Sequence, residues 1–139
     1  MKPTSPDLDE LAAVARLRLA LRRFQNATDE VTSRNHLTPR QYDLLGLLLD
    51  PTRTNCSTSA IAAALLLSRN STSELVSRAV EAGLVTRTQD RHDARLKPLK
   101  PTSLGRRQYF SAVADLRPER TELVAILREA TVSARALAP

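Results

Sequence analysis

The sequence has few of the residues that build disulfide-rich or membrane-spanning proteins. Only one of its 139 residues is cysteine, 3% are aromatic and none is tryptophan. The single thiol, Cys56, excludes an intrachain disulfide, in agreement with a reducing compartment. The longest apolar run, Ala60 to Leu67, is far shorter than the roughly 20 residues that cross a bilayer. The acidic residues that follow Pro6 are not typical of a secretory signal, so we expect a soluble, cytoplasmic protein.

With so few aromatic side chains, the core must consist mainly of Leu, Val and Ala. The hydrophobic fraction is 42%, and small aliphatic side chains suit the packing of helices. A chain of this length is typical of one domain. The 21 Lys and Arg residues outnumber 15 Asp and Glu residues, giving a net charge of +6. We therefore expect a mainly helical protein with a polyanionic partner.

A long first helix is predicted to begin at Ser5-Pro6-Asp7. Ser5 can serve as N-cap, with proline in the first helical position and acid in the first turn. Two apolar rows follow, comprising Leu8, Leu11, Ala12, Ala15 and Leu19 in one, and Val14, Leu17, Leu21, Phe24 and Val31 in the other. Two rows are too broad for a single contact with a small domain, so one of them is expected to meet a second subunit.

The clearest helix start lies at Thr38. Thr38 can act as N-cap and Gln41 can complete a capping box, while Leu37 and Tyr42 occupy the positions of a hydrophobic staple. This helix must end before Pro51, because proline disfavours helical geometry in the residue that precedes it. A loop over residues 51–56 is expected to follow.

Two short helices are predicted next, with Ser57 and Ser68 as their N-caps. Only Leu66 and Leu67 separate them, a spacing that makes them a helix-turn-helix candidate. The second helix should end at Gly83, which can supply a left-handed stop. The residues expected to point inward from it are Leu75, Val76 and Ala79.

A β-hairpin and two further helices complete the prediction. Residues 84–88 and 95–100 are expected to form the strands, with a polar turn over 89–94. Pro98 and Pro101 cannot donate backbone hydrogen bonds, so the second strand should be short and at an edge. Thr102 can cap a helix that reaches about Leu116. Pro118 begins a last helix whose apolar residues have the spacing of a helix-helix seam, namely Leu123, Leu127, Ala130, Ala134 and Leu137.

Several short motifs occur in a fixed order along the chain. They are Leu37-Thr38-Pro39-Arg40-Gln41-Tyr42, Ile61-Ala62 with Leu65 and Ser68, Leu75-Val76-Ser77-Arg78, Gly83-Leu84-Val85-Thr86-Arg87, Asp93-Ala94-Arg95 and Thr102-Ser103-Leu104-Gly105. In this order and spacing the chain resembles the MarR family of bacterial transcription regulators. Three residues depart from the family pattern: Leu66 stands in place of a frequent glycine, Ala94 in place of a basic residue and Pro101 in place of the usual leucine.

The resemblance implies a single winged helix-turn-helix domain over residues 1–139. Residues 5–35 and 102–139 would form dimerisation helices, and residues 37–100 would form a DNA-binding lobe with the hairpin as its wing. The family resemblance also implies a homodimer whose recognition helices enter successive major grooves of a near-palindromic duplex. It further implies a small-molecule effector of unknown identity. No membrane partner is expected, because the sequence lacks an apolar run long enough to cross a bilayer.

The candidate DNA-binding residues fall into two groups. The resemblance implies base contacts from the helix after Ser68 and a wing contact from Arg95, supported by Asp93. Arg40, Arg87, Lys97 and Lys100 are cations suited to phosphate contacts. The predicted DNA-binding residues are Arg40, Ser68, Arg69, Asn70, Ser73, Glu74, Ser77, Arg78, Arg87, Arg91, Asp93, Arg95 and Lys97.

Two functional hypotheses remain open at this point. The first is a sequence-specific repressor that a small-molecule effector releases from DNA. The second is a winged-helix module for protein interaction, or an architectural DNA binder without effector. The second draws support from the predicted recognition helix, in which Glu74 and Glu81 offset Arg69 and Arg78.

The sequence contains no recognisable catalytic or metal-binding pattern. It has no glycine-rich phosphate loop, no framed pair of catalytic carboxylates and no nucleophile elbow, so neither an enzyme nor a cofactor is expected. His36 and His92 lack partners at metal-ligand spacing, although Asp90 and Asp93 flank His92. Cys56 lies in a predicted loop, and a redox role for it stays open.

Overall fold

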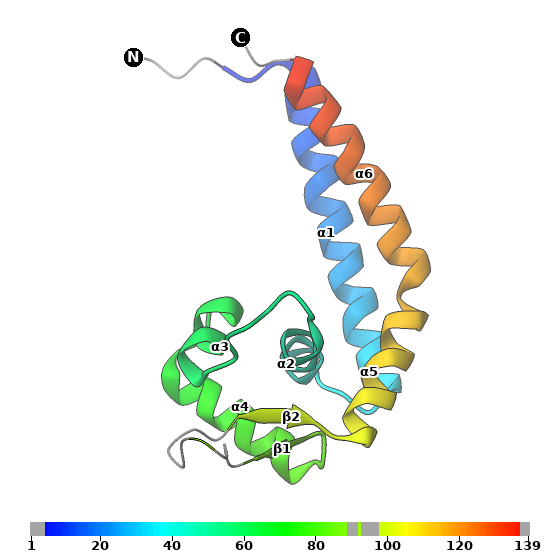
Figure 1. Ribbon diagram of the computed structural model, residues 1–139. Helices are drawn as coiled ribbons and strands as arrows, with labels where there is room; N and C mark the ends of the chain where they lie inside the picture. The colour runs from blue at the N-terminus through cyan, green and yellow to red at the C-terminus, as the bar shows by residue number, and fades with distance from the viewer. Residues whose placement is uncertain (1–4, 89–91, 93–97, 137–139) are drawn as a thin grey trace. The chain divides into compact units, whose positions relative to one another are not determined.

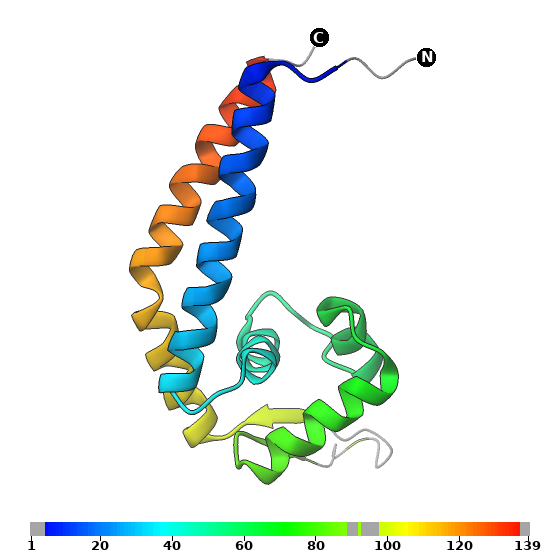
Figure 2. The ribbon, with the colours of Figure 1, turned by 180° about the vertical axis from the view of Figure 1, so that it is seen from behind.

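The computed structural model describes residues 5–88, 92 and 98–136 (Figures 1 and 2). The described elements are mostly helical, with one antiparallel pair of strands, as the sequence predicts. They are α1 (Leu8–Arg34), α2 (Pro39–Leu49), α3 (Thr58–Leu65), α4 (Arg69–Glu81), β1 (Val85–Arg87), β2 (Leu99–Pro101), α5 (Ser103–Asp115) and α6 (Arg117–Ala136).

The chain divides into two compact units. We call Val31–Ala114 the lobe, and the remaining described residues the helical unit. The lobe contains α2 to α4, the strands and nearly all of α5, whereas the helical unit contains most of α1 and all of α6. The predicted organisation as one domain, with dimerisation helices at both ends, stays a prediction.

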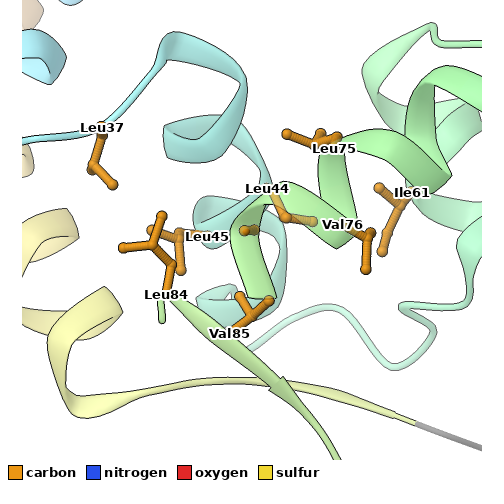
Figure 3. Packing of buried hydrophobic residues seen from close by; sticks show 9 residues of the cluster. Leu37, Leu44, Leu45, Ile61, Leu75, Val76, Leu84 and Val85 are labelled. Carbon is orange, nitrogen blue, oxygen red and sulfur yellow. The ribbon is translucent and has the colours of Figure 1, made fainter. Parts of the chain in front are cut away.

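The lobe has an aliphatic core. Helix α2 contacts α3, α4 and β2, and α4 contacts β1. Figure 3 shows side chains from these elements directed into a common interior. Its buried members are Leu37, Leu44, Leu45, Ile61, Leu75, Val76, Ala79, Leu84 and Val85. The three inward residues predicted for α4 are among them, which confirms that prediction.

Side-chain caps set the starts of the lobe helices. The Thr38 hydroxyl oxygen accepts from the Gln41 backbone amide at 3.1 Å, and the Thr38 amide donates to Gln41 Oε1 at 3.0 Å. These two bonds form the predicted capping box. Ser57, Ser68 and Thr102 also accept a backbone amide three residues ahead, so the predicted caps of α3, α4 and α5 are confirmed.

Three helix ends share one backbone arrangement. At α1, α3 and α4, a residue with positive φ follows the helix, and these residues are His36, Leu66 and Gly83. In each case the next amide bonds to the carbonyl five residues back, as in a Schellman motif. Gly83 confirms the predicted left-handed stop. Leu66 adopts the same geometry at φ 55°, which glycine would adopt at lower steric cost.

The two strands pair with Val85 opposite Pro101 and Arg87 opposite Leu99. Strand β2 is three residues long and, like β1, has one unpaired edge, which confirms the predicted short edge strand. The predicted second strand began at residue 95, but the described strand begins at Leu99 and extends to Pro101. Proline fits there because an edge strand tolerates a residue without a backbone donor. Residues 95–97 lie outside the described part of the chain.

In the helical unit, α1 and α6 run side by side in opposite directions (Figures 1 and 2). Arg16 of α1 forms an ion pair with Glu129 of α6 at 2.7 Å. The predicted Ser5 cap is wrong: α1 begins at Leu8, and Asp7 Oδ1 accepts the Glu10 amide at 2.8 Å. Aspartate and serine are about equally good N-caps. Because Ser5 and Asp7 are only two residues apart, the cap preference alone did not distinguish between them.

The predicted seam of α6 is also partly wrong. Leu127 is 40% exposed, whereas Ile126, which was not predicted, lines two small cavities together with residues of α1. Leu123 and Ala130 are half-buried, as expected for a seam. The side chains of Ala134 and Leu137 lie outside the described part of the molecule. None of the described helices is both long enough and apolar enough to cross a membrane.

Candidate nucleic-acid interface

Helix α4 has two chemically distinct faces. Thr72, Leu75, Val76 and Ala79 are buried at helical spacing. The opposite face carries the predicted base-reading residues, all exposed, which are Arg69, Asn70, Ser73, Glu74, Ser77 and Arg78. One face therefore anchors the helix in the lobe and leaves the other free to approach a surface.

The N-terminal end of α4 is positively polarised. Its first turn contains no acidic residue, so nothing offsets the partial positive charge of the unpaired amides. Arg69 is the first residue of the helix and makes no ion pair within the described chain. Exposed Asn70 follows it. This end of the helix combines two long polar side chains with an electrostatic preference for anions.

Further along α4, part of the charge is neutralised internally. Arg78 forms an i,i+4 ion pair with Glu74, and both side chains remain well exposed. The sequence predicts that acidic residues offset the basic ones on this helix, and for Glu74 and Arg78 this occurs through a direct ion pair. The contact occupies the Glu74 carboxylate and leaves Arg69 as the arginine of this face that forms no ion pair within the described residues.

Ser68 contributes to the site through the backbone. Its hydroxyl oxygen accepts the Ser71 amide at 3.1 Å and lies 3.0 Å from the Ser71 hydroxyl oxygen. Its carbonyl accepts the hydroxyl of buried Thr72 at 2.9 Å. The prediction missed the burial of Thr72, although the spacing 72, 75, 76 and 79 fits a single inward row. Ser68 thus fixes the direction in which α4 begins.

Helix α2 offers a second polarised helix start. Arg40 lies in its first turn, is exposed and has no acidic residue beside it in that turn. Because Pro39 lacks an amide proton and the capping box uses the Gln41 amide, the charge of Arg40 is the main feature that this end presents to an anion.

The described part of the hairpin carries two exposed cations. Arg87 ends β1, and Lys100 of β2 lies opposite Thr86 in the register. The Thr88 amide donates to the Pro98 carbonyl at 2.9 Å and so joins the two sides of the hairpin beyond the paired strands. The predicted wing residues Arg91, Asp93, Arg95 and Lys97 lie outside the described residues.

Other candidate chemistry is sparse in this part of the chain. Among the described residues, no group of three or more His, Cys, Asp or Glu side chains is placed to hold a metal ion. Cys56 is half-buried, with its sulfur 3.7 Å from the Leu47 carbonyl oxygen. One feature that the prediction missed is an open groove between α2 and α3 that contains Asp43 and Tyr109.

These elements define a winged helix-turn-helix fold: α3 and α4 are joined by a tight turn, and a two-stranded hairpin follows α4. The MarR family model matches residues 37–96, the region from the α2 cap into the hairpin. This match confirms, over residues 37–96, the resemblance to the MarR family seen in the sequence.

Solved structures share the fold across nearly the whole chain. A mutant of S. aureus MepR bound to an oligodeoxyribonucleotide is 19% identical, with a TM-score of 0.68 and coverage of 90% of this chain and 97% of MepR. CouR from Rhodococcus jostii RHA1, bound to p-coumaroyl-CoA, is 24% identical, with a TM-score of 0.65 and coverage of 100% and 98%. A MarR-family regulator from Rhodococcus sp. RHA1 is 21% identical, with a TM-score of 0.67 and coverage of 96% of both chains. No curated protein matches the chain.

Proposed function

We propose that the protein regulates transcription by binding duplex DNA sequence-specifically as a homodimer, and that it is a repressor released by a small-molecule effector. The observation that carries this proposal is the arrangement of α4. Its buried face fixes it in the lobe, while its exposed face presents Arg69 and Asn70 at an N-terminus without acidic neighbours. Arginine pairs well with guanine and asparagine with adenine in the major groove.

The affinity for DNA would come mainly from outside this reading face. Each phosphate that a cation neutralises releases a counterion and adds to binding regardless of sequence. Exposed Arg40, Arg87 and Lys100 are suited to this task, and so are the predicted wing residues Arg91, Arg95 and Lys97. The reading helix then contributes mostly specificity.

Support for a homodimer comes from the helical unit. Leu8, Leu11 and Leu19 of α1 are 83%, 51% and 53% exposed in the single chain. A second copy that covers them would remove this apolar surface from water. The relatives support the remaining parts of the proposal, since one was solved with an oligodeoxyribonucleotide and another with p-coumaroyl-CoA.

The ion pair between Glu74 and Arg78 favours the second hypothesis, a winged helix that binds a protein or any duplex without an effector. It lowers the positive charge available on the exposed face of α4. Uniform weak binding to all duplexes would favour this second function.

Selection of bound duplexes from a random pool, combined with the mass of the protein in solution, tests the proposal. We expect a dimer and a near-palindrome whose half-sites are spaced by about one helical turn, roughly 10 base pairs. A monomer that ignores duplex DNA even in dilute salt would overturn the proposal.

Two variants assign roles within the same experiment. Asn70→Ala should change the selected sequence, with a loss of about 1 to 3 kcal/mol at individual base pairs. Arg95→Ala should leave the sequence unchanged but lower the salt dependence by about one unit for each phosphate that the arginine no longer neutralises. Arg22→Ala, an exposed arginine of α1, is the matched control and should change neither property.

A further inference from the structure

An open groove of about 530 Å³ lies within the lobe, between α2 and α3 and beside α5. Two aromatic rings stand at its edge: those of Tyr42 and Tyr109 have centroids 5.0 Å apart and are inclined by 32°. A Cβ atom placed on Gly46 would come within 3.1 Å of the Tyr109 hydroxyl oxygen. The absence of a side chain at Gly46 therefore leaves room for the Tyr109 ring beside the groove.

The charged groups that line this groove all have the same sign. Asp43 and Asp50 are among its lining residues, and no Arg, Lys or His of the described chain is. Asp50 accepts from the amide and hydroxyl of Thr52 at 2.9 and 2.7 Å. Asp43 makes no hydrogen bond or ion pair with any described residue. One carboxylate is thus held in place, and the other has no cation beside it among the described residues.

The groove follows α2 from Tyr42 to Asp50 and reaches the turn at Leu66, where α3 ends. Two carboxylates and two tyrosine side chains therefore line the same groove. Carboxylates attract a cation, and aromatic rings also interact favourably with cations.

The protonation behaviour of the two carboxyl groups agrees with this geometry. Partial burial raises the pKa of Asp43, and its carboxylate gains no compensating contact from the described residues. Hydrogen bonds from the Thr52 side chain and amide lower the pKa of Asp50. The positive charge of Arg53 also lowers this pKa, but it is the smallest of the causes. Arg53 does not line the groove. A bound cation would offset the cost of desolvating the Asp43 carboxylate.

We propose that this groove binds a small organic cation with a flat apolar body. The positive charge faces Asp43 and Asp50, and the apolar body lies against the tyrosine rings and the exposed side chain of Leu66, which is 91% accessible. A molecule bound in the groove would contact Leu66, which lies in the short turn between α3 and α4. Its action as the effector rests on the proposed function, whereas its binding does not.

Two fluorescent dyes with the same ring system provide the probes. Rhodamine 6G is a monovalent cation and fluorescein is an anion, and the anisotropy of each is titrated with the full chain without DNA. We expect rhodamine 6G to bind and fluorescein to bind at least about tenfold more weakly, because the groove has one sign of charge. Equal binding of the two dyes would overturn the proposal.

Substitutions locate the binding. Asp43→Asn should weaken rhodamine 6G binding about fivefold or more, and Asp43→Lys should reverse the preference between the dyes. Asp9→Asn, an exposed acid on α1, is the matched control and should change neither affinity. Unchanged rhodamine 6G binding in folded Asp43→Lys would remove the groove as the site. Binding that depends on Asp43 but leaves DNA affinity unchanged would retain the site and exclude its role as the effector site.

Discussion

The lobe and the helical unit differ in how much of their apolar surface is buried within the single chain. In the lobe, Leu44 and Leu45 are completely buried, and Ile61 is 1% exposed. In the helical unit, several apolar residues of α1 remain on the surface, with Leu8 at 83% and Val14 at 61%. Since burial of aliphatic side chains is the main source of stability, the lobe contains its own stabilising core. The helical unit instead leaves apolar side chains of α1 exposed to solvent, where association with another chain can bury them.

The largest expected effect that would sharpen this contrast is in the lobe core. Leu44→Ala removes a fully buried side chain and leaves a cavity, which should lower the free energy of unfolding by about 2 to 5 kcal/mol. Urea unfolding at fixed protein concentration measures it. Leu8→Ala, the same change at an exposed position of α1, is the control and should cost much less. Equal losses for the two variants would contradict the contrast.

The exposed leucines of α1 should instead affect association. Leu11→Ser combined with Leu19→Ser removes two half-exposed apolar side chains, each of which contributes roughly 1 kcal/mol if a second copy covers it. Because a symmetric dimer loses these side chains from both protomers, four in all, the dimer dissociation constant should rise by roughly several hundredfold in sedimentation equilibrium. Leu66→Ser, at an exposed leucine of the lobe, should leave that constant unchanged. A double variant that dimerises as tightly as the original protein would show that these leucines lie outside the interface.

Close packing in the lobe should also make it intolerant of added atoms. A Cβ atom on Gly105 of α5 would overlap the Leu84 carbonyl oxygen and lie 3.2 Å from Leu45 Cδ2. Gly105→Ala should therefore reduce stability by about 1 to 3 kcal/mol, despite the higher helix propensity of alanine. Thermal unfolding measures the loss. Ser111→Ala, at an exposed position of the same helix, controls for propensity, and a Gly105→Ala variant as stable as this control would refute the close approach.

The local parts of this architecture could be predicted from sequence, and the parts that depend on packing could not. Thr38, Ser57, Ser68 and Thr102 were correctly predicted as caps because a cap bonds to an amide only three residues away. The choice between Ile126 and Leu127 on α6 depends on where α1 lies, which spacing within α6 does not reveal.

The candidate sites divide in the same way. The outward face of α4 followed from helical periodicity, and the structure places its residues on one exposed surface. The groove beside Asp43 was missed because its lining combines residues of α2 and α3 with Tyr109 of α5, which is distant from them in sequence. The DNA contacts themselves stay predictions, since a contact depends on the partner as well as on the chain.

The smallest expected effect on stability concerns two helix ends within the lobe, at Leu66 and Gly83, which have the same backbone geometry but different residues. Leu66 and Gly83 both have positive φ, at 55° and 72°, but only one is glycine. A left-handed leucine costs roughly 1 to 2 kcal/mol, and glycine would return part of that gain through its greater freedom in the unfolded chain. Leu66→Gly should therefore raise the free energy of unfolding by about 0.5 to 1 kcal/mol, whereas Gly83→Ala should lower it by a similar amount. Urea unfolding of both variants measures the pair, and a destabilised Leu66→Gly would show that the exposed leucine side chain contributes more to the lobe than its backbone strain costs.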